Sequence, residues 1–369
     1  MQKLNKFRGC LLGGAIGDAL GYPVEFMKLQ DIKTTYGKSG IRKLVLRNNK
    51  ALISDDTQMT LFTANGLLNA TTEQRLNGHE LNYIEHIKTA YFDWWVTQTY
   101  YANNNSGWAE TWLMNIPELY NSRSPGATCI TAFEDGYNGS IEKPINNSKG
   151  CGGVMRVAPI GLYFDSSNSN YTMEEIDMIG AKVAALTHGH PLGYMSAAMM
   201  VHIINKCIYS DMHLKEIVTE ALVKINELFY DSEYLTEFNT IINKAIELSE
   251  SKISNYDAIK QIGQGWVAEE ALAIAIYSSL KYSGDFEEAV ICAVNHDGDS
   301  DSTGAITGNI LGAYVGLNNI FRDLWDSLEI KEVITEIAND LYNDCLVSRY
   351  SGVKDKIWEL KYVDKTYYI

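Results

Sequence analysis

Two segments of the chain carry a glycine at every fourth position, and this pattern constrains the fold more than any other. The two glycine ladders are Gly9, Gly13, Gly17, Gly21 and Gly304, Gly308, Gly312, Gly316. Residues four apart lie on one face of an α-helix, so each ladder forms a smooth stripe. Glycine lowers helix stability relative to alanine, which indicates that close backbone packing keeps it there. We therefore expect two helices that pack against each other through these stripes.

Proline use and hydrophobic spacing predict an all-α protein. The last of six prolines is Pro191, so the chain from there to residue 369 lacks the residue that breaks helices most strongly. Apolar residues recur at helical spacing over 81–95 and 214–229. Thr172 and Glu175 form a capping-box pattern before another helical stretch. No comparable alternation of apolar and polar residues suggests a sheet.

Length and composition predict one compact domain over residues 1–369. The chain has no proline-rich, serine-rich or low-complexity stretch that would serve as a linker. Apolar residues make up 46% of it, which is enough for a sizeable core, and no apolar run is long enough to cross a bilayer. We expect no membrane association. Residues 204–260 and 346–369 carry no recognisable motif, so scaffold, insertion and partner surface all remain open for them.

Charge and cysteine use favour a cytoplasmic protein that does not bind nucleic acid. Lys3, Lys6 and Arg8 precede an apolar run as in a signal peptide, but Asp18 and several glycines do not fit one. The six cysteines show no CxxC pair, which indicates a reducing compartment. A net charge of −15 without clustered basic residues argues against a nucleic-acid surface. We expect a monomer.

Two acidic clusters precede helix-competent runs. Ser54, Asp55 and Asp56 stand before the first run, where a helix N-cap alone would explain them. The second cluster reads Asp297-Gly298-Asp299-Ser300-Asp301-Ser302. Capping needs only one of its three aspartates, and a divalent cation would offset the repulsion among them. A solvated acidic turn is the alternative.

The two clusters together offer carboxylate and hydroxyl oxygens, which select magnesium, manganese or calcium over zinc. There are enough acids for two ions that share ligands, an arrangement suited to holding substrate oxygens and activating water.

Three further segments are candidates for chemistry. Glu25 follows a predicted helix stop at Pro23, and the residues alone favour an ordinary surface glutamate there. Glycines at 150, 152 and 153 form either a phosphate-binding loop or a flexible connection. His188 and His190 interrupt two helices and either bind phosphate or close a turn.

Seven segments in order resemble the ADP-ribosylglycohydrolase family, which includes dinitrogenase reductase-activating glycohydrolase and ADP-ribosylarginine hydrolases. They are FRGCLLGGAIGDALGYPVEF (7–26), SDDTQM (54–59), RSPGATC (123–129), GCGGVMR (150–156), THGHPLGY (187–194), GQGWVAEEAL (263–272) and DGDSDSTGAITG (297–308). Each segment is weak evidence alone, whereas seven in this order are specific. The resemblance covers about residues 7–345 and implies an all-α, multi-helix domain with a binuclear magnesium cleft.

The resemblance also implies roles for individual residues. The metal ligands would be Ser54, Asp55, Asp56, Asp299, Asp301 and Ser302. They would hold two Mg²⁺ ions, for which Mn²⁺ is a possible substitute. Glu25 and Asp56 would handle protons, and Gly150, Cys151, Gly152, Gly153 and His188 would contact the diphosphate. Trp266 would help to shape the nucleotide pocket. One departure is Asp297, which stands where the family often has glycine and which either perturbs the site or points to solvent.

The activity implied by the resemblance is hydrolytic removal of ADP-ribose from a modified protein. Details of the SDDT, GCGG, THGHP and DGDSDSTG segments resemble the arginine-directed branch, so ADP-ribosylarginine is the favoured linkage. A hydrolase of another ADP-ribosyl linkage is an alternative. A second alternative is a non-enzymatic relative that binds ADP-ribose or a toxin and acts by occlusion. A third alternative is a two-metal phosphohydrolase.

Overall fold

The computed structural model of the protein describes residues 2–78, 80–99, 109–136, 138–167 and 171–369. The described chain forms 17 α-helices. Within these ranges the only sheet is a two-stranded hairpin of β1 (Leu46–Arg47) and β2 (Lys50–Ala51). The all-α prediction is therefore confirmed, with one short hairpin that the helical periodicity did not reveal.

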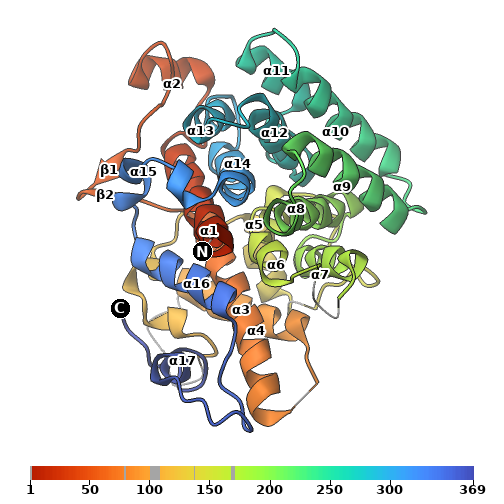
Figure 1. The fold of residues 1–369 in the computed structure, drawn as a ribbon. Coiled ribbons are helices and arrows are strands. Elements are labelled where there is room, and N and C mark those ends of the chain that lie inside the picture. The colour runs from red at the N-terminus through yellow and green to blue at the C-terminus, as the bar shows by residue number, and fades with distance from the viewer. Residues whose placement is uncertain (1, 79, 100–108, 137, 168–170) are drawn as a thin grey trace.

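Helices α1 (Gln2–Gly21) and α14 (Ser300–Val315) run side by side through the middle of the molecule (Figure 1). Their glycine ladders face each other, as predicted. A Cβ atom on Gly17 would overlap the carbonyl oxygen of Gly304, and one on Gly308 would overlap that of Gly13. Only glycine permits so close an approach, which explains why the ladders persist in two helices.

The other helices enclose this central pair (Figure 1). Those nearest to it or to its neighbours are α3 (Asp55–Asn77), α4 (Tyr83–Gln98), α6 (Ala158–Tyr163), α7 (Met173–Ala185), α8 (Pro191–Tyr209), α12 (Ala268–Lys281), α13 (Phe286–Val294) and α16 (Lys331–Asn343). The remaining helices are α2 (Leu29–Tyr36), α5 (Ala127–Glu134), α9 (Leu214–Leu228), α10 (Leu235–Ser249), α11 (Asn255–Ile262), α15 (Arg322–Asp326) and α17 (Lys356–Tyr362).

The segments without a recognisable motif are packed parts of this architecture. Helix α9 packs against α8, and α10 packs against α12. The tail packs through α17, whose Trp358 Nε1 donates to Thr72 Oγ1 on α3 at 3.0 Å. At the start of α7, Thr172 and Glu175 form the capping box that the sequence predicts.

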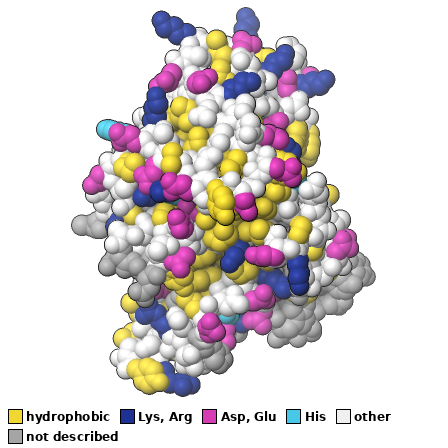
Figure 2. All heavy atoms as spheres, turned by 90° about the vertical axis from the view of Figure 1, so that its right-hand side faces the viewer, with side chains coloured by type: hydrophobic (Ala, Val, Ile, Leu, Met, Phe, Trp, Pro, Cys, Tyr) yellow, Lys and Arg dark blue, Asp and Glu magenta, His cyan; other side chains and the backbone are white. Residues whose placement is uncertain are grey.

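The surface mixes charges of both signs. On the face shown in Figure 2, acidic and basic side chains are interspersed rather than gathered by sign. Across the described residues, no helix is long and apolar enough to cross a membrane.

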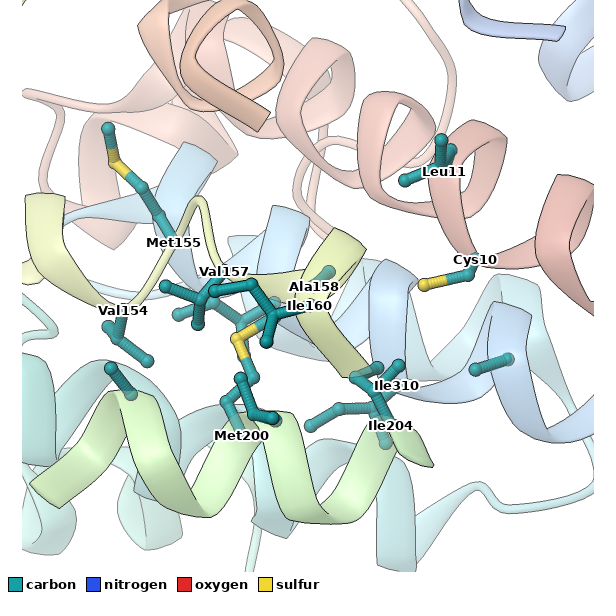
Figure 3. Close-up of a cluster of buried hydrophobic side chains, with 14 of the residues drawn as sticks. Cys10, Leu11, Val154, Met155, Val157, Ala158, Ile160, Met200, Ile204 and Ile310 are labelled. Atoms are coloured by element: carbon teal, nitrogen blue, oxygen red, sulfur yellow. The ribbon is translucent and has the colours of Figure 1, made fainter. Parts of the chain in front are cut away.

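The hydrophobic core is continuous around the central pair. Figure 3 shows Cys10 of α1, Ile160 of α6, Ile204 of α8 and Ile310 of α14 gathered in one buried cluster. Met155 belongs to the same buried core. A core on several sides of α1 and α14 fixes both helices, and therefore fixes where their ends lie.

Candidate metal centre and active site

The two acidic segments are the N-termini of two helices. Ser54 is the N-cap of α3, and its Oγ accepts a hydrogen bond from the Asp56 N–H at 3.3 Å. Asp299 is the N-cap of α14, where its Oδ1 accepts from the Ser302 N–H at 3.3 Å. Acids suit the positive end of a helix dipole, so the capping interpretation of each segment holds locally.

The structure brings these two helix ends together. Ser302 Oγ on α14 donates to Asp56 Oδ2 on α3 at 3.3 Å. One carboxylate oxygen from each of Glu25, Asp299 and Asp301 lies within 4.8 Å of the others. Five acids and two hydroxyls thus form one buried group, called the acidic cluster below: Glu25, Ser54, Asp55, Asp56, Asp299, Asp301 and Ser302.

Asp18 positions the α3 half of the acidic cluster. This fully buried residue of α1 accepts hydrogen bonds from the Ser54 N–H at 2.9 Å and from the Thr57 N–H at 3.1 Å. Thr57 Oγ1 also donates to it. The sequence interpretation gave Asp18 no role at the site, although one acid inside an apolar glycine helix was the available signal.

Arg123 holds the other side of the α3 start. Its guanidinium donates to Ile53 O at 2.8 Å and forms an ion pair with Glu329, while its own carbonyl accepts from the Asp55 N–H at 3.3 Å. The Gly126 N–H donates to Asp55 Oδ2 at 3.4 Å. The RSPGATC segment therefore supports Asp55 from the backbone side, a role the sequence did not indicate.

Burial and mutual repulsion shape the electrostatics of the acidic cluster. Loss of hydration on burial, followed by the nearby Asp301, raises the pKa of Asp55, Asp56 and Asp299 well above the usual value. Burial also raises the pKa of Asp301. Close buried carboxylates cannot all carry charge without a compensating cation, so the protein's own groups leave this site short of positive charge.

Unpartnered oxygens test whether the acidic cluster fits a divalent cation. Asp56 Oδ1 and Glu25 Oε2 are buried and have no hydrogen-bond partner. Buried polar atoms are normally satisfied, and unsatisfied ones in a cluster of hard oxygens match the needs of magnesium, manganese or calcium. The residues present therefore fit such an ion. They fit zinc less well, because the donors are mostly carboxylate and hydroxyl oxygens.

Glu25 corrects the expectation of a surface glutamate. The chain leaves α1 at Gly21, forms the short 3₁₀ helix η1 (Tyr22–Val24) around the predicted stop at Pro23, and then turns Glu25 inward. Glu25 is only 7% exposed. Its burial, with Asp301 as the next cause, raises the pKa of Glu25 to about 10. The residue types alone gave no sign of this, because the direction of a loop side chain depends on tertiary packing.

The glycine segment forms the wall next to Asp299. Cys151 to Gly153 make a short 3₁₀ helix, η5, and the Cys151 thiol donates to Asp299 Oδ2 at 2.8 Å. The N–H groups of Gly150 and Cys151 donate to Ser148 Oγ and Trp266 O. Two amides of the predicted phosphate-binding loop are therefore already paired within the protein.

His188 lies beneath this loop. A Cβ on Gly152 would sit 3.0 Å from the His188 ring, and the ring is buried. Burial, with the nearby Arg156, lowers the pKa of His188 to about 3, so the ring is neutral at pH 7. Its neighbour His190 caps α8, where Nδ1 accepts from the Leu192 N–H at 3.1 Å, so this histidine closes a turn.

Trp266 and Phe26 form an aromatic pair next to Glu25. Their rings stack with centroids 5.6 Å apart and planes 19° from parallel. Both remain exposed, Phe26 by 73% and Trp266 by 38%. A pocket of about 230 Å³ lies on the same side and is lined by Tyr22, Pro23, Glu25, Phe26, Val45, Arg47, Leu52 and Ser124. Phe26 and Arg47 were not predicted, because nothing in their sequence context distinguishes them.

Asp297 lies outside the acidic cluster. Its Oδ1 accepts from the Leu29 N–H at 2.6 Å, and its Oδ2 accepts from the Tyr256 hydroxyl at 2.9 Å. The acid therefore neither joins the cluster nor points freely to solvent. It ties the start of α2 to α11.

The fold and the site define a class: an all-helical protein in which two helix N-termini gather buried carboxylates. The family model for ADP-ribosylglycohydrolase matches residues 1–350, and the chain belongs to that family. Its membership supports activity as a hydrolase of ADP-ribosyl bonds.

Similar proteins extend over nearly the whole chain. An uncharacterized protein from Archaeoglobus fulgidus is 28% identical over 344 residues, covering 91% of this chain and 96% of that protein. The Homo sapiens protein ADP-ribosylhydrolase ARH3 is 22% identical over 372 residues, covering 92% and 94%. A solved structure described as an ADP-ribosylglycohydrolase-related protein complex has a TM-score of 0.60 at 22% identity, covering 93% and 99%. That structural likeness shows a shared fold.

Proposed function

We propose that this protein is a magnesium-dependent hydrolase that removes ADP-ribose from arginine side chains of modified proteins. The reaction reverses mono-ADP-ribosylation. We further propose that it acts as a cytoplasmic monomer, with no nucleic-acid or membrane partner. Membership of the ADP-ribosylglycohydrolase family supports the hydrolase class. The choice of arginine rests on the resemblance of four sequence segments to the arginine-directed branch.

The observation that carries the proposal is the acidic cluster with its unpartnered oxygens. Ser54, Asp55 and Asp56 from α3 and Asp299, Asp301 and Ser302 from α14 are the proposed ligands of two Mg²⁺ ions. Bound magnesium would orient the ribose hydroxyls and the attacking water. It would also stabilise the charge that develops as the bond to the acceptor breaks. Mn²⁺ would substitute because it prefers the same oxygen donors.

Protein side chains would handle the protons. Glu25 has a pKa raised to about 10 by burial and Asp301, so it holds a proton that it can donate to the leaving group. Asp56 has a buried oxygen without a partner, Oδ1, which can accept a proton from the attacking water. Burial and Asp301 raise the pKa of Asp56 as well, so Asp56 would act as the base only when bound Mg²⁺ offsets the negative charge around it.

Recognition of the nucleotide would use the surrounding loops. Amides of Gly152 and Gly153 face the diphosphate in this proposal, with His188 supporting them from below. Trp266 offers an exposed ring on which a base or ribose can pack. Arg47 lines the pocket beside Glu25, so its charge would influence which acceptor side chain enters.

The test is release of intact ADP-ribose from an arginine-modified protein and from a serine-modified one, with Mg²⁺ or with chelator. We expect Mg²⁺-dependent release from the arginine substrate. Asp56→Asn should lower kcat by about 10²- to 10⁴-fold, the range for loss of a general base.

The matched control is Asp93→Asn, a buried carboxylate on α4 whose Oδ2 accepts from the Glu110 and Thr111 N–H groups. Asparagine keeps an acceptor oxygen there, so activity should remain. Release from the serine substrate alone would replace the arginine proposal. ADP-ribose binding without release from either substrate would favour a binding protein, and phosphate release would indicate a phosphohydrolase.

A further inference from the structure

Residues 26–53 carry positive charge in a chain whose net charge is −15. The segment contains one acid, Asp31, and seven basic residues: Lys28, Lys33, Lys38, Arg42, Lys43, Arg47 and Lys50. The basic residues are spread along the segment, so no run of them stands out in the sequence. All seven are exposed. This basic segment includes α2 and the β1–β2 hairpin, which lie at the upper left in Figure 1.

Most of these charges have no ion-pair partner. Within the described ranges, Arg42 is the only one of the seven that forms an ion pair, and its partner is Glu288. Basic side chains elsewhere commonly pair, as Lys206 does with Glu220. An exposed group of unpaired like charges attracts opposite charge from solution, so the basic segment favours an acidic partner.

The hairpin places two of these charges side by side. Arg47 on β1 pairs with Lys50 on β2 across the turn. Directly opposite residues of an antiparallel pair share one face, and like charges in such a pair are destabilising. The next residue, Ala51, is fully buried, so the alternation of the strand directs Arg47 and Lys50 toward solvent. The two residues therefore form an exposed fork of cations that a carboxylate between them would stabilise.

Main-chain hydrogen bonds fix the position of this hairpin. Ala51 accepts from the Glu329 N–H at 2.9 Å, and its own N–H donates to Ser327 O at 2.9 Å. The Glu329 side chain pairs with Arg123, which also holds the start of α3. The hairpin and the proposed metal ligands of α3 are consequently tied to the same residues.

The fork reaches the proposed catalytic pocket. Arg47 lines the same pocket of about 230 Å³ as Glu25. In the proposed function the diphosphate lies along the glycine segment 150–153, and none of these four described residues lines this pocket, which leaves it to the acceptor. An arginine acceptor is cationic, so Arg47 repels it unless a negative charge of the substrate lies close to both.

We propose that Arg47 and Lys50 bind acidic side chains that flank the modified arginine on the substrate protein. Substrate carboxylates occupy the fork and offset the repulsion between Arg47 and the cationic acceptor. The lysines in and around α2 extend the positive field, which steers acidic protein surfaces toward the pocket. The inference rests on the proposed function, because it names the kind of protein surface that the proposed hydrolase prefers.

The test compares two peptides that carry ADP-ribosylarginine, one with glutamates on both sides of it and the other with glutamines. With Mg²⁺, the wild type should show a kcat/KM about 3- to 10-fold higher for the glutamate peptide, the size expected of two exposed ion pairs. Combining Arg47→Gln with Lys50→Gln should reduce this ratio to about 1, and so should about 0.5 M NaCl in the wild type, because salt screens exposed charges. Lys252→Gln with Lys354→Gln is the matched control, since it removes the same charge from exposed positions outside the basic segment and should keep the ratio.

Binding of the same peptides in chelator, measured by fluorescence anisotropy, separates this inference from the proposed function. If neither peptide is hydrolysed with Mg²⁺, the proposed function fails, whereas tighter binding of the glutamate peptide that the hairpin variant abolishes still supports the acidic partner. No preference between the peptides in either measurement, or a preference that the hairpin variant keeps, overturns the inference. Binding of a labelled oligonucleotide that the variant loses, without a preference between the peptides, would assign the basic segment to nucleic acid instead. Should the double variant not fold, Lys50→Gln alone must lower the ratio.

Discussion

The two parts of helix α14 differ in packing and in charge. Along its stem, the backbone at Gly304, Gly308 and Gly312 lies so close to that of α1 that no Cβ atom would fit at these three positions. At its start, Asp299 and Asp301 lie against Glu25, and Ser302 donates to Asp56 of α3. The stem is uncharged and complementary to its partner. The first turn concentrates like charges that oppose one another.

This difference indicates how the protein tolerates a destabilising site. Repelling carboxylates would separate if their helices could slide, but backbone contact along the stem holds α14 in register with α1. Asp18 on α1 then fixes the start of α3 through the Ser54 and Thr57 N–H groups. Strain at functional sites persists when the surroundings over-determine it, and the glycine interface supplies that constraint here.

The largest expected effect is on activity, from Asp301→Asn in the first turn. Removing one charge while keeping the shape should lower ADP-ribose release by about 10²- to 10⁴-fold, as expected for loss of a group that acts in the transition state. Unfolding temperature in chelator should stay equal or rise, because one source of repulsion is gone. Activity assays and calorimetry check both parts. Full activity of the variant, or strong destabilisation in chelator, would contradict the claim that the first turn serves activity and the stem serves stability.

The next effect is on stability, from Gly308→Ala in the stem. The added methyl group would overlap the Gly13 carbonyl, and such overpacking costs about 1–3 kcal/mol or more of unfolding free energy. Gly284→Ala is the control, because a Cβ there meets nothing within 4 Å. Urea unfolding of the two variants measures the difference. Equal unfolding free energies of the two variants would mean that α1 and α14 can move apart at no cost in stability. The proposed constraint on the acidic cluster would then be wrong.

The smallest effect concerns His296, at the boundary between the two parts. Its Nε2 lies 3.0 Å from Thr303 Oγ1, and burial lowers the pKa of this histidine to about 4, against about 6.5 in an unfolded chain. The neutral ring contributes stability above pH 6.5 that is lost as pH falls toward 4.

The measurement compares urea unfolding of wild type and His296→Gln at pH 6.5 and pH 5. The difference in unfolding free energy, wild type minus variant, should fall by up to about 2 kcal/mol. Buried acids with raised pKa values produce the opposite trend in both proteins, so the comparison cancels them. A difference that does not change with pH would show that the ring is protonated in the folded state or accessible to water.

The sequence predicts the features that depend on spacing along one helix. Glycine ladders, apolar periodicity and the Thr172 capping box each have a fixed period, so the helices and the α1–α14 contact could be predicted. Candidate ligands at the starts of α3 and α14 could also be predicted, because capping and charge density are local properties.

Features set by contacts between distant segments could not be predicted in this way. The inward turn of Glu25 and the backbone support from Asp18 and Arg123 depend on how loops pack. Asp297 looks like a member of the acidic cluster in sequence, yet it faces α2 and α11. A side chain's direction after a turn is decided by tertiary structure, which one sequence does not specify locally.

The pairing of α1 with α14 also governs when the protein can fold during synthesis. Asn309 donates to the Cys10 carbonyl across 299 positions of the chain. At about 5–20 residues per second, the ribosome needs roughly 15–60 seconds to make that intervening length. Throughout this time the glycine face of α1 lacks the partner against which it packs in the folded protein. The acidic cluster cannot assemble before α14 emerges, and an incomplete chain therefore lacks the proposed metal site.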